Sequence, residues 1–326
     1  MRHWSRRGVL ARLLWPAALV FGFVVFFRRL FYRLRIFKSC KIGIPVIVIG
    51  NLSAGGAGKT PLVLWVADFL KRSGRKPGIV SRGYGGSVSR TKEARAATIA
   101  SDPAEVGDEP MLLSRRSGCP VWVSADRVLA ATTLRRENPE VDVILADDGL
   151  QHYALRRDLE ICVVDAHGLG NRWLMPAGPL REPLSRLASV GAVVVHGQNT
   201  GIDGFAMKLE GQNLASLANA KDVRPLKSFA GQKVHAVAGI GDPKRFFLQL
   251  AGAGLKIVPH PFPDHHAFRA EDLEFGDGLP VVMTEKDAVK CKRIAKAHHW
   301  VFAVDAALDP AFGRWLLERL GGPKAA

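Results

Sequence analysis

The chain has 326 residues, 48% of them hydrophobic and 23% charged, and its 33 glycines and 19 prolines exclude a disordered, collagen-like or repeat-dominated protein. At about 100–200 residues per domain, this length predicts two domains. The net charge of +16 is concentrated at the N-terminus, and no basic stripe in the body alternates with stacking aromatic residues, so we expect no nucleic-acid partner. Four scattered cysteines without CxxC spacing predict reduced thiols in a cytosolic body.

The N-terminal segment, residues 1–38, combines basic and apolar character. Its stretch Leu13–Phe27 carries no charge and is flanked by arginines on both sides. As a helix this stretch would be about 22 Å long, shorter than the roughly 30 Å hydrocarbon core of a bilayer. We therefore predict a membrane-embedded or interfacial helix on an anionic lipid surface, with the body on the cytoplasmic side. A full span, a cleaved signal peptide and an ordinary core helix remain as alternatives, although no small-x-small cleavage site follows.

From residue 44 onward, short β-branched runs alternate with helical patterns, which predicts an α/β fold with a mostly parallel sheet flanked by helices. We place a core domain at 39–200, a linker at 201–230 and a smaller C-terminal α/β domain at 231–326. The expected strands are Ile44–Ile49, Gly78–Ser81, Val121–Ser124, Val141–Ala146, Glu160–Asp165, Ala192–His196, Lys233–Ala238, Leu255–Pro259, Pro280–Thr284 and Trp300–Val304. The expected helices are Thr60–Ser73, Glu109–Arg116, Asp126–Glu137, Pro183–Ala188, Pro243–Ala251 and Pro310–Leu320.

A glycine-rich loop joins the first expected strand to the first expected helix. Small residues let backbone N–H groups wrap a phosphate that faces a helix N-terminus, so the loop predicts a P-loop nucleotide site. Lys59 would reach the β- and γ-phosphates, and Thr60 would hold Mg²⁺. The strict GxxxxGK[ST] pattern has glycine where this chain has Ser53. The residues expected around the nucleotide are Asn51, Ser53, Ala54, Gly55, Gly56, Ala57, Gly58, Lys59 and Thr60.

An acidic pair, Asp147 and Asp148, follows the expected strand Val141–Ala146. Carboxylates at the carboxyl end of a parallel strand lie at the ligand-binding edge of an open sheet. One of the two, with Asp147 favoured, is therefore expected to bind a metal, while a helix cap or turn is the alternative for such a pair taken alone.

Two nucleotide-binding classes are excluded. A GTPase would need an NKxD motif, which TEKD at Thr284–Asp287 matches only with its lysine displaced. Membrane-associated ATPases with a KGGxGK[ST] loop would need a lysine at Ala54. A kinase acting on a lipid-side acceptor remains, with a regulatory nucleotide-binding protein at the membrane as its rival.

Seven motifs, in order over nearly the whole chain, resemble those of the tetraacyldisaccharide 4'-kinase family of the lipid A pathway, whose phosphate loop shares the departure at Ser53. They are NLSAGGAGKTP (Asn51–Pro61), SRGYGG (Ser81–Gly86), VGDEP (Val106–Pro110), DDGLQH (Asp147–His152), PAGPLREP (Pro176–Pro183), FPDHHAF (Phe262–Phe268) and TEKDAVK (Thr284–Lys290). The resemblance implies ATP, Mg²⁺ and transfer of the γ-phosphate to the 4'-hydroxyl of a membrane-embedded acylated glucosamine disaccharide 1-phosphate. It also implies a body on the cytoplasmic face of the bacterial inner membrane, with no obligatory protein partner.

The resemblance also implies two groups of functional residues. Asp108 would accept the hydroxyl proton, assisted by His265, so domain closure would be part of catalysis. Glu109 and Asp147 would join Thr60 around Mg²⁺. Without the resemblance, Asp108 has a helix cap and His265 a solvated loop position as alternatives.

Three residues are expected at the acceptor: Gln151, His152 and Arg181. The guanidinium of Arg181 suits a phosphate because it binds oxyanions bidentately, with a surface ion pair to Glu182 as the alternative. For Gln151 and His152 a turn role is the alternative. The sequence leaves open the roles of Arg82, Asp148, Lys286 and Asp287.

Overall fold

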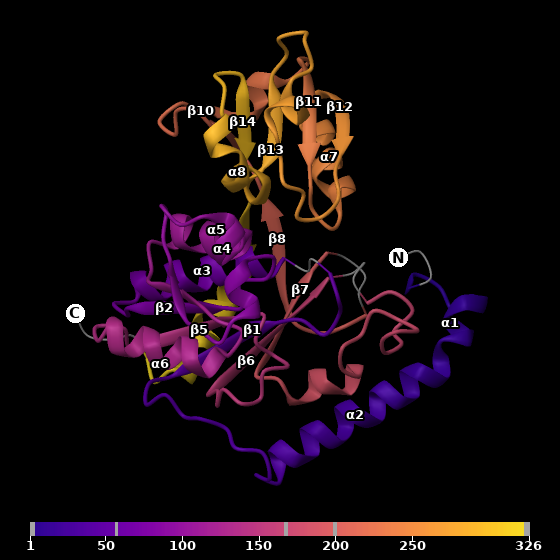
Figure 1. Cartoon of the computed structure of the whole chain (residues 1–326), viewed down its shortest axis with the longest axis vertical. Helices are drawn as coiled ribbons and strands as arrows, with labels where there is room; N and C mark the ends of the chain where they lie inside the picture. Colours follow the sequence, from indigo (N-terminus) through magenta and orange to yellow (C-terminus); the bar gives the residue numbers. More distant parts are fainter. Residues whose placement is uncertain (1–3, 56–57, 166–168, 198–200, 323–326) are drawn as a thin grey trace.

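Two α/β units and a long N-terminal helix make up the structure, a computed structural model that describes residues 4–55, 58–165, 169–197 and 201–322 (Figure 1). The helices are α1 (Val9–Leu13), α2 (Trp15–Arg33), α3 (Lys59–Arg72), α4 (Pro103–Val106), α5 (Asp108–Ser117), α6 (Arg127–Glu137), α7 (Pro243–Gly252), α8 (Glu285–Cys291) and α9 (Pro310–Arg319). The strands of the larger unit are β1 (Val46–Gly50), β2 (Pro77–Ser81), β3 (Arg95–Ala97), β4 (Val121–Val123), β5 (Val143–Asp147), β6 (Leu159–Asp165), β7 (Ala192–His196), β8 (Phe205–Glu210) and β15 (Asp305–Leu308). Those of the smaller unit are β9 (Asn213–Ser216), β10 (Val223–Pro225), β11 (Lys233–Ala238), β12 (Lys256–Pro261), β13 (Val281–Thr284) and β14 (His299–Phe302).

The larger sheet has the strand order β15-β8-β7-β6-β1-β5-β2-β4-β3. Its central strands run parallel, and β1 lies between β5 and β6. Both β1 and β5 are buried along their whole length, as expected for parallel strands that are covered on both faces. Antiparallel pairs occur at the two edges, β3 with β4 and β15 with β8. The expected fold class, a mostly parallel sheet with flanking helices, is therefore confirmed.

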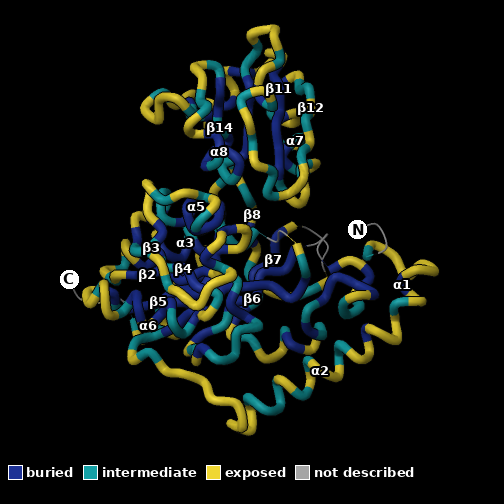
Figure 2. The backbone as a smooth tube through the Cα atoms, in the orientation of Figure 1, coloured by how far each residue is buried: buried dark blue, intermediate teal, exposed yellow. Residues whose placement is uncertain are grey.

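Alternate side chains of the central strands pack against opposite layers. Ile49 and Leu145 share one core cluster with Leu70 of α3 and Phe312 of α9. The opposite face of the same strands packs against Leu134 of α6. Figure 2 shows the result as a continuous buried centre in the larger unit. This packing fixes the sheet edge at which the phosphate loop begins.

Most expected elements overlap an element of the structure, but the helix expected over 183–188 and the linker expected over 201–230 are wrong. The helix expected over Pro183–Ala188 is a 3-10 helix, η3 (Leu184–Ser189). The expected linker, 201–230, holds β8 of the larger sheet and β9 and β10 of the smaller one. In β8, Phe205, Met207 and Leu209 alternate with less buried neighbours, a period-2 pattern that the polar average of the segment concealed.

The C-terminal segment also differs from the expected domain boundary. After β14 of the smaller sheet, the chain returns to the larger unit, where β15 pairs with β8 and α9 joins the main core. The smaller unit is therefore formed by residues between β8 and β15 rather than by everything after residue 231.

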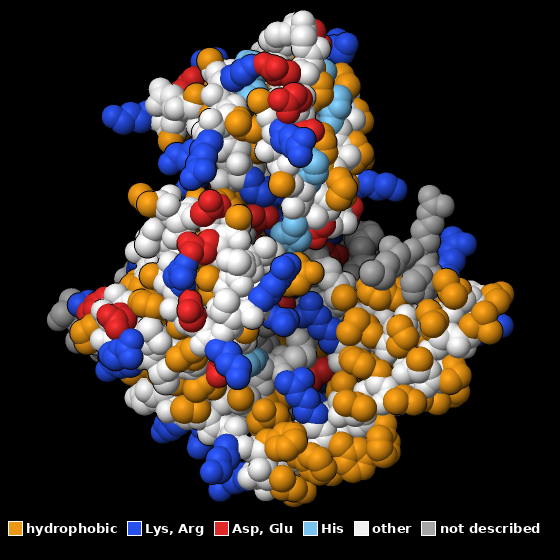
Figure 3. All heavy atoms as spheres, in the orientation of Figure 1, with side chains coloured by type: hydrophobic (Ala, Val, Ile, Leu, Met, Phe, Trp, Pro, Cys, Tyr) orange, Lys and Arg blue, Asp and Glu red, His pale blue; other side chains and the backbone are white. Residues whose placement is uncertain are grey.

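The N-terminal helix is longer than its apolar stretch predicted. Among the described residues, α2 alone has the length and composition to cross a membrane; its 19 residues would extend about 28 Å. Large apolar side chains on it, including Val20, Phe23 and Phe26, are exposed and form the broad hydrophobic surface in Figure 3. The core-helix alternative is therefore wrong. Gly22 lets α2 approach the body, since an added Cβ would come within 2.9 Å of Leu174 Cδ1.

Phe312→Ala should destabilise the larger unit by about 3–5 kcal/mol, because it empties a fully buried ring site between α9 and the sheet. Urea unfolding followed by tryptophan fluorescence measures this, since the rings of Trp65 and Trp315 lie 5.5 and 5.7 Å from that of Phe312. The control, Leu248→Ala, removes a side chain that is 73% exposed and should change stability by less than about 0.5 kcal/mol. Equal unfolding midpoints for F312A and wild type would contradict the packing of α9 on the larger sheet.

Candidate active site

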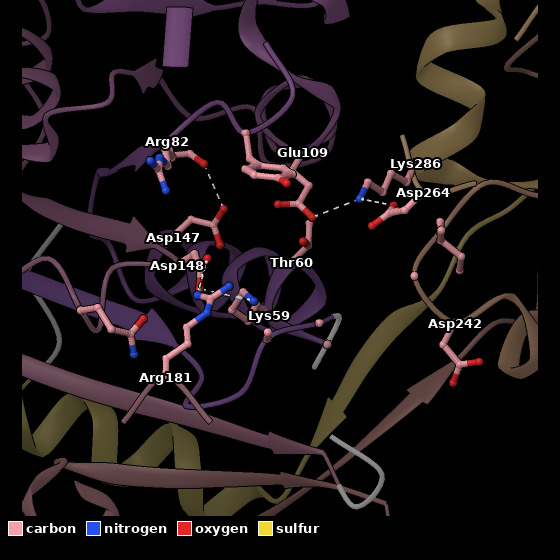
Figure 4. Close-up of a pocket in the computed structure, with 18 of the residues that line it drawn as sticks. Lys59, Thr60, Arg82, Glu109, Asp147, Asp148, Arg181, Asp242, Asp264 and Lys286 are labelled. Atoms are coloured by element: carbon pink, nitrogen blue, oxygen red, sulfur yellow. Dashed lines mark hydrogen bonds and ion pairs between the residues drawn. The ribbon is translucent and has the colours of Figure 1, made fainter. Parts of the chain in front are cut away.

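A cavity of about 1130 Å³ lies between the two units and α2. Its walls include the phosphate loop, the carboxyl end of β5, the start of α5 and the loops that follow β11, β12 and β13 in the smaller unit. Figure 4 shows charged side chains from these elements directed toward one shared space. Residues from separate sequence motifs meet here because the carboxyl ends of parallel strands lie at one edge of a sheet.

The phosphate loop is stabilised by a contact between two of its own residues and by a contact from the PAGPL segment. Inside the loop, Lys59 Nζ donates to Asn51 Oδ1 at 3.2 Å. Gly58 is the N-cap of α3 and has φ +79, in the left-handed region that favours glycine. From outside, the carbonyl of Pro179 accepts from the Ala54 N–H at 2.8 Å, so this amide is engaged by the PAGPL segment.

The residues expected around the nucleotide fall into three groups. Gly56 and Ala57 lie outside the described residues. Asn51 and Ser53 are buried beneath the loop. The cavity wall contains Ala54, Gly55, Gly58, Lys59 and Thr60.

The two neighbouring acids at the end of β5 have different surroundings. Asp147 is buried and accepts from Ser81 Oγ at 3.1 Å. Asp148, with φ +48, pairs with Lys59 Nζ at 3.4 Å and with Arg181 Nη1 at 3.1 Å. Asp148 is thus the counter-ion of two cations, whereas the Asp147 carboxylate has no cation this close among the described residues.

The surroundings of Asp147 and Asp148 shift the pKa values of the two carboxyl groups in opposite directions. Burial, together with Glu109 and Asp148, raises the pKa of Asp147 from 3.8 to about 7. Burial also acts to raise the pKa of Asp148, but Lys59 and Arg181 outweigh it, and the net pKa is lowered. Asp147 therefore ionises fully near neutral pH only when a further cation compensates its charge.

The expected magnesium ligands share one region of the cavity. Figure 4 shows Thr60 next to Glu109, with the Asp147 carboxylate directed toward the same space. Within the described ranges, no three His, Cys, Asp or Glu side chains form a group that could hold a metal without other ligands. Mg²⁺ commonly takes only one or two carboxylates, with phosphates and water as its other ligands. The oxygen donors and the raised pKa of Asp147 thus fit Mg²⁺ beside a bound nucleotide.

Asp108 and His265 come from different units and contact each other beside the cavity, whose wall includes His265 and Glu109. His265 Nδ1 lies 3.2 Å from Asp108 Oδ2, and Lys290 Nζ lies 3.6 Å from the same oxygen. His265 has φ +61, and its ring contacts that of Tyr84 with centroids 5.2 Å apart. The N-cap of α5 is Gly107, so Asp108 is not the helix cap, and His265 is not a solvated loop side chain.

Lys286 and Asp287, whose roles the sequence left open, have separate surroundings. Lys286 Nζ lies 3.5 Å from Glu109 Oε1, 3.3 Å from Asp264 Oδ1 and 3.4 Å from His265 Nε2. Burial acts to lower the pKa of Lys286, but the nearby carboxylates outweigh it and raise the pKa, so the amine stays charged. Asp287 is buried and accepts from the Gly239 N–H at 2.9 Å, which fixes the loop after β11.

The three residues expected at the acceptor line the same cavity. Gln151 Nε2 donates to the carbonyl of Asn51 at 3.1 Å, so its amide faces the phosphate loop. Burial and the charge of Arg127 lower the pKa of His152 to about 4, so this imidazole is neutral at physiological pH. The alternative ion pair of Arg181 with Glu182 is wrong, because Arg181 pairs with Asp148.

Sequence reasoning missed two cations near the acids. Arg127 is buried and donates to the Asp147 carbonyl at 3.4 Å; burial lowers its pKa to about 10. Its position just after β4, at the ligand-binding edge, was a usable signal. Lys290 pairs with Asp108 and follows Lys286 by four residues, which places both lysines on one face of α8. Arg82 lines the cavity and is exposed.

Comparisons with known proteins agree on one family. The sequence model described as tetraacyldisaccharide-1-P 4'-kinase, LpxK, matches residues 10–321. A tetraacyldisaccharide 4'-kinase of Azoarcus sp. is 47% identical over 99% of this chain and 96% of its own, and that of Alkalilimnicola ehrlichii is 51% identical over 92% and 90%. The crystal structure of LpxK from Aquifex aeolicus in complex with ATP has a TM-score of 0.81 at 28% identity, covering 96% of this chain and 100% of that one.

Asp147→Asn should make the stability of the protein, measured without Mg²⁺, depend less on pH between about 4 and 7. The folded chain retains a proton on Asp147 up to about pH 7, whereas the unfolded chain releases it near pH 3.8. The stability contributed by this proton is present at low pH and is lost as the pH rises from about 4 to 7. Thermal unfolding in EDTA should therefore show wild type losing stability relative to D147N across that window. A constant difference between the two proteins from pH 4 to 7 would contradict the raised pKa.

Proposed function

Since this chain belongs to the tetraacyldisaccharide-1-P 4'-kinase family, we propose that its cavity is the site where the γ-phosphate of ATP passes to the 4'-hydroxyl of a tetraacylated glucosamine disaccharide 1-phosphate. The chain is an ATP-binding kinase of lipid A biosynthesis. The observation that carries the site assignment is the contact between Asp108 and His265, which joins the two units beside the cavity that the phosphate loop also lines.

Asp108 is the proposed base. Phosphoryl transfer passes through a loose transition state, so the base needs to take the hydroxyl proton only late in the reaction. One oxygen of Asp108 contacts His265 Nδ1 and Lys290 Nζ, which leaves its other oxygen for the acceptor hydroxyl. His265 then orients the carboxylate, while Lys290, which also pairs with Asp287 at 3.0 Å, adds positive charge beside it.

Lysines from both units stabilise the transferring group. Charge in the transition state spreads over the equatorial phosphoryl oxygens, where fixed cations act most strongly. Lys59 comes from the larger unit; Asn51 and Asp148 engage two of its three N–H groups, and the third is left for the nucleotide phosphates. Lys286 comes from the smaller unit and lies between Glu109 and His265, within reach of the same region.

Thr60, Glu109 and Asp147 would hold Mg²⁺. Bound there, Mg²⁺ would supply positive charge against the negative charge that develops on the transferring phosphate. Arg181 and His152 are assigned to the acceptor side of the cavity, Arg181 as a cation and His152 as a neutral hydrogen-bonding group. Gln151 was expected there too, but its amide donates to Asn51 of the phosphate loop, which favours a role in positioning that loop.

The body lies at the cytoplasmic face of the bacterial inner membrane, with α2 in contact with the lipid. The exposed apolar face of α2 and the arginines at both of its ends support this position, because such a surface is stable only when it is covered. An acceptor whose acyl chains stay in the bilayer can then enter the cavity alongside α2, which contributes to the cavity wall.

Asp108→Ala should lower kcat by about two to four orders of magnitude, the usual contribution of a positioned base, while ATP affinity stays within about threefold. Transfer of radiolabelled γ-phosphate to a tetraacyl disaccharide 1-phosphate in detergent micelles measures turnover, and equilibrium titration measures ATP binding. Asp102→Ala is the control, because Asp102 caps α4 outside the cavity. Wild-type turnover in D108A would refute the base assignment. ATP binding without transfer in wild type would favour the regulatory rival.

Phe23→Asp with Phe26→Asp should reduce sedimentation with phosphatidylglycerol vesicles several-fold, because both rings lie on the exposed face of α2. The matched control is Val223→Asp with Leu248→Asp, which places the same charges at exposed apolar positions of the smaller unit. An unchanged pelleted fraction in the α2 variant would reject α2 as the lipid contact.

A further inference from the structure

We infer that Arg28 of α2 is a positioning residue for the phosphate loop and that it acts through Gln151. This inference rests on the ATP site proposed above. It gives the N-terminal helix a part in nucleotide binding in addition to its contact with lipid.

The turn that contains Gln151 exposes three successive carbonyl groups to arginine donors. Arg157, from the same unit, donates to the carbonyl of Leu150 at 3.1 Å and to that of His152. The carbonyl between them belongs to Gln151 and accepts from Arg28 Nη2 at 3.1 Å. Arg157 therefore fixes the first and third carbonyl groups of this turn from within the larger unit, and Arg28 fixes the second from α2. Charge-assisted hydrogen bonds of this kind are stronger than neutral ones.

The side chain of Gln151 carries this constraint to the phosphate loop. Its Nε2 donates to the carbonyl of Asn51 at 3.1 Å, and Asn51 is fully buried. The other end of Asn51 receives Lys59 Nζ at 3.2 Å. A buried carbonyl that loses its donor is destabilised, so a displaced Gln151 amide would release Asn51 from its position. Two residues thus connect α2 with the lysine that faces the phosphates.

Further contacts hold α2 against the same turn. The rings of Tyr32 and Tyr153 lie 5.6 Å apart, and Ser39 Oγ donates to the carbonyl of Tyr153 at 2.8 Å. These contacts fix the approach of α2, so that Arg28 is presented to the turn in a defined place. Figure 1 shows α2 running diagonally below the side of the larger unit that holds β6 and β7.

Arg28→Ala should weaken ATP binding about three- to tenfold in equilibrium titrations of the full-length chain with ATP and Mg²⁺ in detergent. Arg28→Lys should stay within about twofold of wild type, because its ammonium can still donate to the Gln151 carbonyl. The matched control is Arg33→Ala, which removes the same charge from the same helix. Arg33 is exposed and lies outside the cavity wall, and the described structure gives it no hydrogen bond or ion pair.

A double-mutant cycle tests the route through Gln151. Gln151→Ala should weaken ATP binding as much as R28A, and the double variant should be no weaker than either single one, because both changes interrupt one connection. If Q151A does not fold, the comparison of R28A with R28K and R33A still decides. Kinetics should show a raised KM for ATP with the KM for the acceptor unchanged.

Several outcomes would overturn the inference: ATP affinity of R28A within twofold of wild type, an equal loss in R33A, or a change confined to the KM for the acceptor. The last would make Arg28 an acceptor contact. The titration needs no acceptor, so failure of lipid phosphorylation and failure of this inference are separate results. Absence of ATP binding in wild type would defeat both.

Discussion

The parallel pairing of β1 with β5 is the constraint on which the rest of the site depends. Their register places Ile49 opposite Asp147, so the phosphate loop and the acidic pair leave the sheet side by side. Helices α3 and α5 begin at the same edge and bring Thr60 and Glu109 to the space between them. Because both strands are buried throughout, this arrangement is supported by the main hydrophobic core and does not depend on the loops.

The charges that gather at this edge nearly compensate one another. Lys59 and Arg181 satisfy Asp148, and Lys286 approaches Glu109 from the smaller unit. Asp147 is buried and has two other carboxylates close by, and the burial first and these like charges second raise its pKa to about 7. Charges in such partly dry surroundings are tolerated only when they are paired. The cavity is therefore electrostatically incomplete by itself, and a nucleotide that arrives with a divalent cation completes it.

Much of this arrangement could be predicted from the sequence. The central strands of the larger sheet and the positions of Lys59 and Asp147 followed from local patterns, because β-branched runs and a glycine-rich loop act within a few residues. The edge strands β3 and β15 were not expected. The Asp108–His265 pair needed the family resemblance, since no local pattern connects residues that lie in different units. The strand β8 was concealed by the polar residues of its exposed face. The burial of Arg127 could not be predicted, because it depends on the packing of other segments, although its place after β4 indicated the ligand-binding edge.

The connection between the two units has a further consequence. Asp305 and Glu210 are cross-strand partners in the larger sheet, and the chain between them forms the smaller unit. The smaller unit is thus an insertion into an edge hairpin, and its entry and exit points lie about 5 Å apart. An inserted segment with adjacent ends can fold without pulling its host strands apart, and a compact insertion lowers the entropy that closing the host hairpin costs. The pairing of β8 with β15 is in this way coupled to the folding of the smaller unit.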